Sequence, residues 1–320
     1  MDSNTREVSD YTSQQTWKSI SGYFPENKRI DYNSQPEETF IPWLNGSIHL
    51  DQYRNPDAPA RVIMLHGVGG NGRILSFMGV PLFKKGLEVI CPDLPGYGYT
   101  GTKSDDITFD GWISAVNHII EKETANDHRP LFLFGFSLGG TLAYHVAAKN
   151  SKVKGIITTC LLDQRIRKVR DYSAINKTMS RFGPAFLKLF NATIPGFMLP
   201  MKWVANTGAI VNNPGLLKIL LNDKTSSGVS VPIRFLYSVI TAQPAIEPED
   251  FQQCPVALFH PQDDKWTPVE ISRIFFDRIK GEKELKILEN AGHFPLEKPG
   301  INQLEEFTYS FIQKHISHLG

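Results

Sequence analysis

One serine lies in a sequence context that can make its hydroxyl a nucleophile. Residues 135–139 read Gly-Phe-Ser-Leu-Gly, a G-x-S-x-G pattern centred on Ser137. An apolar run precedes the pattern and a helix-like segment follows it, as a strand-turn-helix nucleophile requires. Glycine at both flanking positions permits a turn so tight that side chains there would clash, which leaves Ser137 strained and exposed above the sheet. The pattern predicts a nucleophile at Ser137, with the backbone N–H of Leu138 pointing at a developing oxyanion.

A serine nucleophile needs a base, and the base needs a carboxylate that orients it. His293 lies in a loop just after a strand-like run. Loops that follow parallel strands gather at one edge of the sheet, which is the edge that carries Ser137. Asp263 and Asp264 also follow a strand-like run, and Asp163 follows another. Position therefore predicts His293 as the base and leaves the acid open among these three aspartates.

A glycine run offers a competing chemistry. Residues 67–72 read Gly-Val-Gly-Gly-Asn-Gly after a strand-like run, and Asp93 follows Gly72 by 21 residues. This arrangement is typical of a dinucleotide-binding fingerprint, in which the acid holds the ribose. However, a hairpin signal precedes the run, whereas the fingerprint usually follows the first strand of its domain, and residues 94–98 form a turn-rich loop. Both features count against nicotinamide or flavin binding.

Short apolar runs alternate with helix-like segments along most of the chain. The strand-like runs suit parallel strands buried on both faces, and they are RVIMLH, LEVIC, PLFLFGF, KGIITTC, PVALFH and ELKIL. Segments with apolar residues at three- and four-residue spacing, typical of helices, are 109–120, 138–149, 268–279 and 302–314. Near the start of the chain, EETFIPW and SIHLDQY flank Asn45-Gly46, which indicates a β-hairpin. We therefore expect an α/β fold with a mostly parallel, doubly wound sheet.

Two stretches depart from this alternation. Residues 1–35 are polar and aperiodic, and we expect a lead-in that is mobile or wraps the surface. Residues 161–252 contain no clear strand and hold helix-like pieces separated by prolines. This pattern predicts a helical cap inserted between two late strands. Residues 36–160 and 253–320 would then form one core domain.

Composition excludes several classes of function. The 34 Lys and Arg against 33 Asp and Glu leave a formal charge of +1, which gives no long-range field for nucleic acid or anionic lipid. Three scattered cysteines are too few for a disulfide scaffold or a zinc site, and we expect buried thiols. No apolar run approaches the roughly 18 residues that span a bilayer, and the polar start of the chain lacks a signal region. We expect a cytoplasmic protein without a transmembrane segment; transient contact with a membrane surface and the oligomeric state stay open.

Taken together, these motifs resemble the α/β-hydrolase family from about residue 40 to residue 318. Residues 66–68 (His-Gly-Val) are similar to the family's H-G-x motif, which implies the backbone N–H of Val68 as the second oxyanion donor. Residues 93–98 are similar to its D-x-P-G-x-G motif, and the loop around His293 is similar to its histidine motif. The resemblance makes the glycine run an oxyanion loop rather than a phosphate cradle. It implies neither a metal nor an organic cofactor.

The resemblance also selects among the aspartates. In the family, the acid stands four residues before a proline in a G-x-x-D-x-x-x-P pattern. Pro268 therefore selects Asp264. Pro261 stands where the family has glycine, and this departure keeps Asp263 as the runner-up.

The implied chemistry is hydrolysis through an acyl-enzyme. Ser137 would attack an acyl carbon while His293 takes its proton, and Asp264 would hold the imidazole. The oxyanion would lie between the N–H groups of Val68 and Leu138. Water activated by the histidine would then release the acid.

The composition of the expected cap bears on the substrate. Its segment 182–204 is rich in Phe, Met and Leu, and those side chains that line a cavity would favour hydrophobic esters over peptides or charged substrates. The order H-G-x-G-x-x-x-R ending at Arg73 resembles the monoacylglycerol lipase and lysophospholipase branch, although carboxylesterases share it. We expect a hydrolase of carboxylic esters of a hydrophobic small molecule or lipid. Alternatives on the same fold are an amidase, thioesterase, C–C bond hydrolase or acyltransferase, and, in another class, a non-catalytic ligand receptor.

Overall fold

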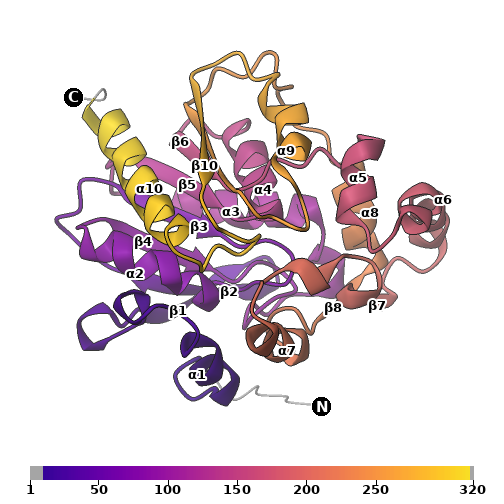
Figure 1. Ribbon diagram of the computed structural model, residues 1–320, viewed down its shortest axis with the longest axis horizontal. Helices are drawn as coiled ribbons and strands as arrows, with labels where there is room; N and C mark the ends of the chain where they lie inside the picture. Colours follow the sequence, from indigo (N-terminus) through magenta and orange to yellow (C-terminus); the bar gives the residue numbers. More distant parts are fainter. Residues whose placement is uncertain (1–9, 318–320) are drawn as a thin grey trace.

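The structure is a computed structural model that describes residues 10–317, and its centre is an eight-stranded sheet (Figure 1). In spatial order the strands are β1 (Glu37–Trp43), β2 (Gly46–Tyr53), β4 (Glu88–Pro92), β3 (Arg61–Leu65), β5 (Leu131–Gly135), β6 (Val153–Thr158), β9 (Val256–Pro261) and β10 (Lys283–Leu288). β2 pairs antiparallel with β1 on one side and with β4 on the other, and all other neighbouring strands in this sheet are parallel. The predicted fold class, a mostly parallel and doubly wound α/β sheet, is confirmed.

Helices cover both faces of the sheet. Those outside residues 161–252 are α1 (Gln15–Ser21), α2 (Ser76–Lys84), α3 (Phe109–Glu123), α4 (Leu138–Ala147), α9 (Val269–Phe276) and α10 (Gly300–Ser317). Single 3-10 turns lie at Glu26–Lys28, Tyr32–Ser34, Arg73–Leu75, Ser104–Asp106, Met201–Trp203 and Thr207–Ala209. Because side chains alternate along a strand, Ile63 and Leu65 of β3 pack with α3 and α4. Val62 and Met64 of the same strand pack with α2 and α10 on the opposite face.

Residues 161–252 leave the sheet after β6 and return to it at β9. They form α5 (Arg167–Ser173), α6 (Lys177–Thr193) and α8 (Ile233–Thr241), which lie on the right of Figure 1, and α7 (Pro214–Asn222), which lies near its bottom centre. The absence of a strand here was expected, and this expectation is wrong: β7 (Met198–Pro200) and β8 (Ser230–Pro232) form a two-stranded antiparallel sheet. Each of these strands has three residues and ends in proline, so neither is long enough to give a period-two pattern.

The described part of the N-terminal lead-in packs against the core. Tyr11, Trp17, Ile20 and Phe24 are buried in the same apolar cluster as α2. The sequence leads us to expect a lead-in that is either mobile or wrapped over the surface. Residues 10–35 wrap over the surface. The remainder of the lead-in lies outside the described residues.

Candidate active site

Ser137 lies at the tip of a sharp turn between β5 and α4. Its backbone has φ 52° and ψ −125°, a strained conformation for a residue other than glycine. The flanking glycines explain how the turn fits. A Cβ on Gly135 would come 2.1 Å from the carbonyl oxygen of Gly139, and one on Gly139 would come 2.3 Å from that of Leu65. The Ser137 N–H donates to Thr159 Oγ1 at 3.0 Å, which fixes the turn to the end of β6.

His293 and Asp264 meet Ser137 at the carboxyl ends of the parallel strands. His293 Nε2 lies 2.9 Å from Ser137 Oγ, and His293 Nδ1 lies 2.8 Å from Asp264 Oδ2. His293 and Asp264 are buried, whereas Ser137 is partly exposed. The three side chains come from separate loops, and they form one continuous hydrogen-bonded row. Such a row can pass a proton from a serine hydroxyl to an imidazole that a carboxylate orients.

The Asp264 carboxylate is held by donors besides the histidine. Its Oδ1 accepts the backbone N–H groups of Trp266 and Thr267, each at 2.8 Å. Its Oδ2 accepts the Thr267 hydroxyl at 3.0 Å. Burial alone would raise the pKa of Asp264, but the imidazole of His293 and these hydrogen bonds lower the pKa to about 2. The acid therefore remains ionised throughout the neutral range.

The other candidate acids lie elsewhere. Asp263 is exposed, and its backbone N–H donates to the carbonyl oxygen of Ala291 at 2.9 Å. Asp163 forms an ion pair with Arg165 at 2.8 Å. Of the three aspartates that position left open, the structure brings only Asp264 to hydrogen-bond distance of His293.

Val68 and Leu138, the expected oxyanion donors, lie beside Ser137. Leu138 is the first residue of α4, so its N–H has no acceptor within the helix. A Cβ on Gly67 would come 2.9 Å from Ser137 Cβ and 3.0 Å from Leu138 N, so the loop that carries Val68 passes directly against the turn. Val68, Ser137 and Leu138 line the same cavity. An oxyanion formed at the serine would therefore lie close to both backbone groups.

That cavity has a volume of about 300 Å³ and opens from Ser137 towards the segment 161–252. Its walls are mainly apolar and come from α6, α8 and the residues between them, including Phe186, Leu187, Phe235 and Leu236. None of the described residues that line it is Asp or Glu. A cavity of this size and character accepts a hydrocarbon chain more readily than a charged group.

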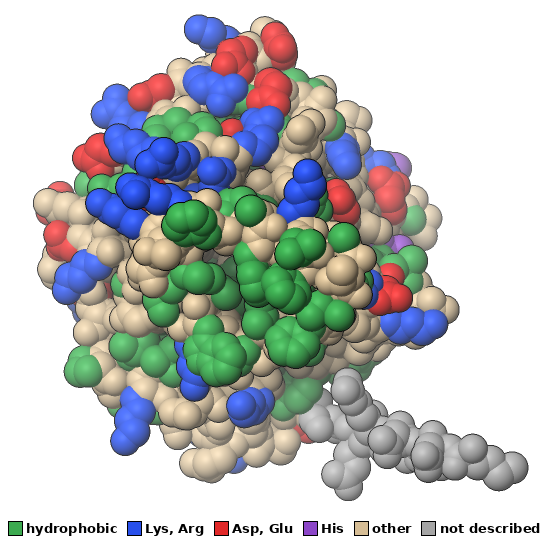
Figure 2. Space-filling model, turned by 90° about the vertical axis from the view of Figure 1, so that its right-hand side faces the viewer, with side chains coloured by type: hydrophobic (Ala, Val, Ile, Leu, Met, Phe, Trp, Pro, Cys, Tyr) green, Lys and Arg blue, Asp and Glu red, His purple; other side chains and the backbone are tan. Residues whose placement is uncertain are grey.

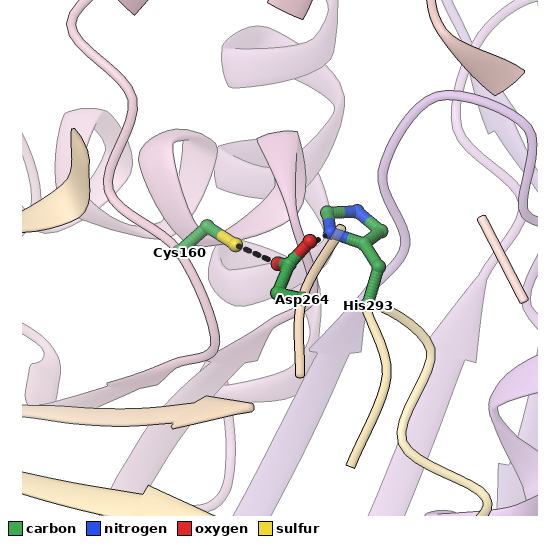
Figure 3. Close-up of side chains that lie close together, drawn as sticks. All are labelled: Cys160, Asp264 and His293. Atoms are coloured by element: carbon green, nitrogen blue, oxygen red, sulfur yellow. Dashed lines mark hydrogen bonds and ion pairs between the residues drawn. The ribbon is translucent and has the colours of Figure 1, made fainter. Parts of the chain in front are cut away.

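Cys160, Asp264 and His293 have donor atoms within 4.8 Å of one another, a spacing that could hold a metal ion (Figure 3). The chemistry of the donors argues against ligation. Burial raises the pKa of the Cys160 thiol well above its usual range, and a metal would need the thiolate. The thiol lies 3.3 Å from Thr267 Oγ1 and 4.0 Å from Asp264 Oδ2, so it acts as a neutral neighbour of the acid. Within the described chain, all three cysteines are buried and free, as expected.

Asp93, which would hold the ribose if residues 67–72 bound a dinucleotide, is already bonded to groups of the protein. Asp93 Oδ1 accepts the N–H of Gly72 at 2.7 Å, and its Oδ2 accepts the hydroxyl of Tyr11 at 2.9 Å. The carboxylate is fully buried and lies 2.9 Å from His49 Nδ1, so no ribose could reach it. The run itself forms the loop beside Ser137. This geometry supports the oxyanion interpretation over the dinucleotide one.

Arg73 and its neighbours form a second polar site, the buried ionic cluster of Glu38, His49, Asp51, Arg73 and Asp93. Arg73 Nε donates to Asp51 Oδ2 at 2.6 Å, and its second nitrogen lies 2.6 Å from Glu38 Oε1. His49 Nε2 lies 3.1 Å from Glu38 Oε2. Burial alone would lower the pKa of His49, but Asp93 and the other carboxylates raise the pKa to about 10. Glu38, His49 and Asp51 have the spacing of a metal site, yet the guanidinium of Arg73 and the imidazolium of His49 already form ion pairs with these carboxylates.

Two residues at the site were not anticipated from the sequence. Thr267 Oγ1 lies 3.3 Å from His293 Nδ1 and bonds Asp264, so it helps to fix their geometry. The ring of Trp266 packs on the His293 imidazole with centroids 4.8 Å apart, and its Nε1–H donates to the carbonyl oxygen of Ser173 at 3.2 Å. The Asp264 side chain accepts the backbone N–H groups two and three residues later, a local turn that aspartate favours, but the sequence gives no signal for the contacts of Thr267 and Trp266 with His293.

Comparison with known proteins places this geometry in context. A family model described as serine aminopeptidase, S33, matches residues 56–299. A thermostable monoacylglycerol lipase of Bacillus sp. (strain H-257) is 24% identical over 277 residues, which cover 86% of this chain and 97% of that protein. A solved structure of a soluble variant of monoglyceride lipase from Saccharomyces cerevisiae, in complex with a substrate analog, superposes with a TM-score of 0.74 at 19% identity, over 91% of this chain and 98% of that one. The solved structure of the monoacylglycerol lipase of Paleococcus ferrophilus superposes with a TM-score of 0.66 at 22% identity, over 85% of this chain and 99% of that one.

Proposed function

Because the chain belongs to the α/β-hydrolase family described as serine aminopeptidase, S33, we propose that it is a serine hydrolase that cleaves carboxylic esters carrying a hydrophobic acyl group. The observation that carries the proposal is the apolar cavity of about 300 Å³ that opens from Ser137. The similar proteins named as monoacylglycerol lipases support a glycerol or comparable small alcohol as the leaving group.

The proposed reaction starts with Ser137 Oγ, which attacks the acyl carbon while His293 Nε2 takes its proton across the 2.9 Å contact. Asp264 holds Nδ1 and stabilises the imidazolium that forms. The same proton then passes to the leaving alcohol, and the acyl group stays on Ser137 as an ester. Water, deprotonated by His293, releases the fatty acid and restores the serine.

The N–H groups of Val68 and Leu138 are the proposed donors to the tetrahedral oxyanion. Backbone donors of this kind are in place before the reaction, and they favour the transition state because the charge appears only there. The position of Leu138 at the start of α4 adds the helix dipole to the same charge. No side chain of the oxyanion site has to move.

An aminopeptidase activity, which the family description brings to mind, fits this site poorly. Binding the free ammonium of a peptide in an enclosed site needs a carboxylate or several aimed carbonyl oxygens. The described lining of the cavity contains no Asp or Glu, and it includes the cation Arg170. The same apolar lining accepts an alkyl chain without an unpaired charge.

Residues 161–252 are proposed as the cap that determines the acyl group. Phe186 and Leu187 of α6 and Phe235 and Leu236 of α8 form cavity walls, whereas the core supplies the reacting groups. No helix among residues 10–317 has the length and apolar character needed to cross a bilayer. We further propose a cytoplasmic location, which the free thiols of the three cysteines support.

The test is hydrolysis of p-nitrophenyl esters from acetate to palmitate, together with a monoacylglycerol and an amino-acid p-nitroanilide. We expect ester turnover with a medium- or long-chain optimum and little release of nitroaniline. Ser137→Ala should lower kcat by about 10⁴-fold or more while the unfolding curve stays the same. Ester activity that survives in this variant, or a p-nitroanilide that is preferred over every ester, would contradict the proposal.

A further inference from the structure

Exposed apolar side chains are concentrated on one part of the surface. Ten of the fifteen large apolar residues that are exposed in the described chain lie between residues 172 and 203. We call the following six the cap patch: Phe182, Leu189, Ile194, Phe197, Met198 and Trp203. Figure 2 shows hydrophobic side chains gathered at the centre of this face. A contiguous apolar surface of this kind on a folded domain is a mark of an interaction site.

The same part of the chain is strongly basic, whereas the rest of the chain is acidic overall. Residues 161–203 contain eight Lys and Arg against two Asp, so their formal charge is +6, and the rest of the chain carries −5. The formal charge of +1 for the whole chain hides this asymmetry. Helix α6 bears Lys177, Arg181 and Lys188 and no acidic residue. Figure 2 shows Lys and Arg side chains beside the apolar centre of the face.

The mouth of the cavity coincides with this surface. Met179, Phe186 and Trp203 are exposed, and all three also line the cavity that opens from Ser137. By contrast, Phe182 and Leu189 are exposed to 71% and 62% and do not line it. A partner that covers the cap patch therefore faces the entrance to the proposed acyl site.

We infer that the cap patch docks on an anionic lipid bilayer, with α6 lying along the interface and the cavity mouth facing the lipid. An amphipathic helix with a basic polar face binds in this manner, because its apolar side chains enter the acyl boundary while its cations meet lipid phosphates. A second copy of the chain fits less well, since an isologous contact would bring two copies of this basic segment together. The inference goes beyond the proposed hydrolysis, and it can be measured without turnover.

The chain provides a native reporter for this docking. Trp203 is 61% exposed, whereas Trp17, Trp43, Trp112 and Trp266 are at most 7% exposed. All five tryptophans of the sequence lie within the described residues. A change in exposed indole fluorescence on adding vesicles therefore reports on the cap patch.

The experiment uses the full chain with Ser137→Ala, so that lipid is not consumed. Vesicles of phosphatidylcholine alone are compared with vesicles of phosphatidylcholine and phosphatidylglycerol at 3:1. We expect a blue shift of emission and protection from acrylamide with the anionic vesicles, weaker effects with neutral ones, and reversal by salt. The spectral response should vanish in Trp203→Phe, while co-sedimentation with anionic vesicles persists. No co-sedimentation at low salt, or equal binding to both vesicles, would overturn the inference.

Two pairs of matched variants locate the contact. Phe182→Gln with Leu189→Gln should reduce partitioning at least about tenfold, whereas Tyr32→Gln, at a side chain that is 96% exposed on the N-terminal segment, should not. Each of Arg181→Gln and Lys188→Gln should cost a factor of about five with anionic vesicles only, and Lys122→Gln on α3 should cost nothing. Control variants that weaken binding as much as the cap variants would overturn the assignment.

Two further measurements distinguish membrane docking from the proposed ester hydrolysis and from dimer formation. Phe182→Gln with Leu189→Gln should leave hydrolysis of p-nitrophenyl acetate in solution unchanged, because neither side chain lines the cavity. Vesicle binding by Ser137→Ala is independent of whether the wild type cleaves esters, so either proposal can fail alone. A concentration-dependent dimer that Phe182→Gln dissociates would assign the cap patch to a second copy and overturn membrane docking.

Discussion

His293 Nδ1 lies 2.8 Å from Asp264, and His49 Nδ1 lies 2.9 Å from Asp93. The two pairs differ in what the other imidazole nitrogen faces. His293 Nε2 meets the hydroxyl of Ser137 beside a cavity, whereas His49 Nε2 meets the carboxylate of Glu38 within the buried ionic cluster.

The difference has electrostatic consequences. The carboxylates around His49 raise its pKa to about 10, so it is a fixed cation near neutral pH and cannot accept a proton. It holds β1, β2 and the end of β4 together through charge. A histidine paired with an aspartate is therefore suited to be a base only where its second nitrogen meets a group that gives up a proton and where a substrate can approach.

Asp264→Asn should have the largest effect on this comparison. The amide NH₂ that replaces Oδ2 would donate to His293 Nδ1, which favours the tautomer with a proton on Nε2 and removes the base. We expect kcat for the best ester to fall by about 10⁴-fold, with KM little changed. Steady-state kinetics measure this effect, and Asp263→Asn, at the exposed neighbour, is the control. A larger loss in Asp263→Asn would move the acid to that residue.

His49→Gln should affect stability instead. The folded pKa of His49 is about 10 against an ordinary value of 6.5, so the stability due to its charge is fully present below pH 6.5 and is lost as pH rises towards 10. We expect the variant to unfold about 3–5 kcal/mol more easily at pH 6, because buried carboxylates lose their partner, with a smaller difference at pH 10. Urea unfolding at several pH values measures this difference. A difference that does not depend on pH would contradict a charged His49.

Tyr11→Phe tests how firmly the N-terminal segment joins the same cluster. The hydroxyl donates to the buried carboxylate of Asp93 at 2.9 Å, so its removal should cost about 1.5–3 kcal/mol of unfolding free energy. Ester kinetics at neutral pH should be unchanged, since the cluster lies apart from the catalytic row. Urea unfolding compared with that of the exposed Tyr32→Phe provides the measurement, and equal stability of the two variants would refute the contact.

Gly183→Leu probes the cavity beside Ser137 and His293, to which nothing corresponds at His49 among the described residues. A Cβ at Gly183 would meet no atom within 4 Å, and the residue lines the cavity. The new side chain should fill the acyl site and lower kcat/KM for long-chain esters about tenfold, while acetate turnover persists. Gly208→Leu, which also enters open space but does not line the cavity, is the control. A uniform loss for all chain lengths would show that Gly183 is not part of the acyl site.

The sequence was most informative where a function depends on local geometry. The glycines around Ser137 are needed because of contacts within one turn and its neighbouring strand, so the G-x-S-x-G pattern carries that information. The central strands could likewise be predicted, since burial on both faces makes them apolar throughout. The choice of Asp264 over Asp263 depends on side-chain direction, for which position alone gave no answer.

Other features depend on contacts between distant segments and left no readable pattern. The buried ionic cluster joins residues of β1, β2 and two later loops, and only the fold brings their charges together. Helix α2 contains Pro81 and is almost entirely buried, so it shows neither the expected start signals nor an amphipathic stripe. The apolar residues of the cap patch lie in the segment 182–204, whose Phe, Met and Leu content is plain in the sequence, but the formal charge of +1 for the whole chain hides the basic character of residues 161–203.

The indole of Trp266 belongs to two parts of the molecule at once. Its ring rests on the imidazole of His293, and its N–H holds the carbonyl of Ser173 at the end of α5. A displacement of α5 away from the core therefore breaks this hydrogen bond and changes the restraint on the imidazole. A single side chain thus joins a helix that lines the cavity to the imidazole that faces the serine.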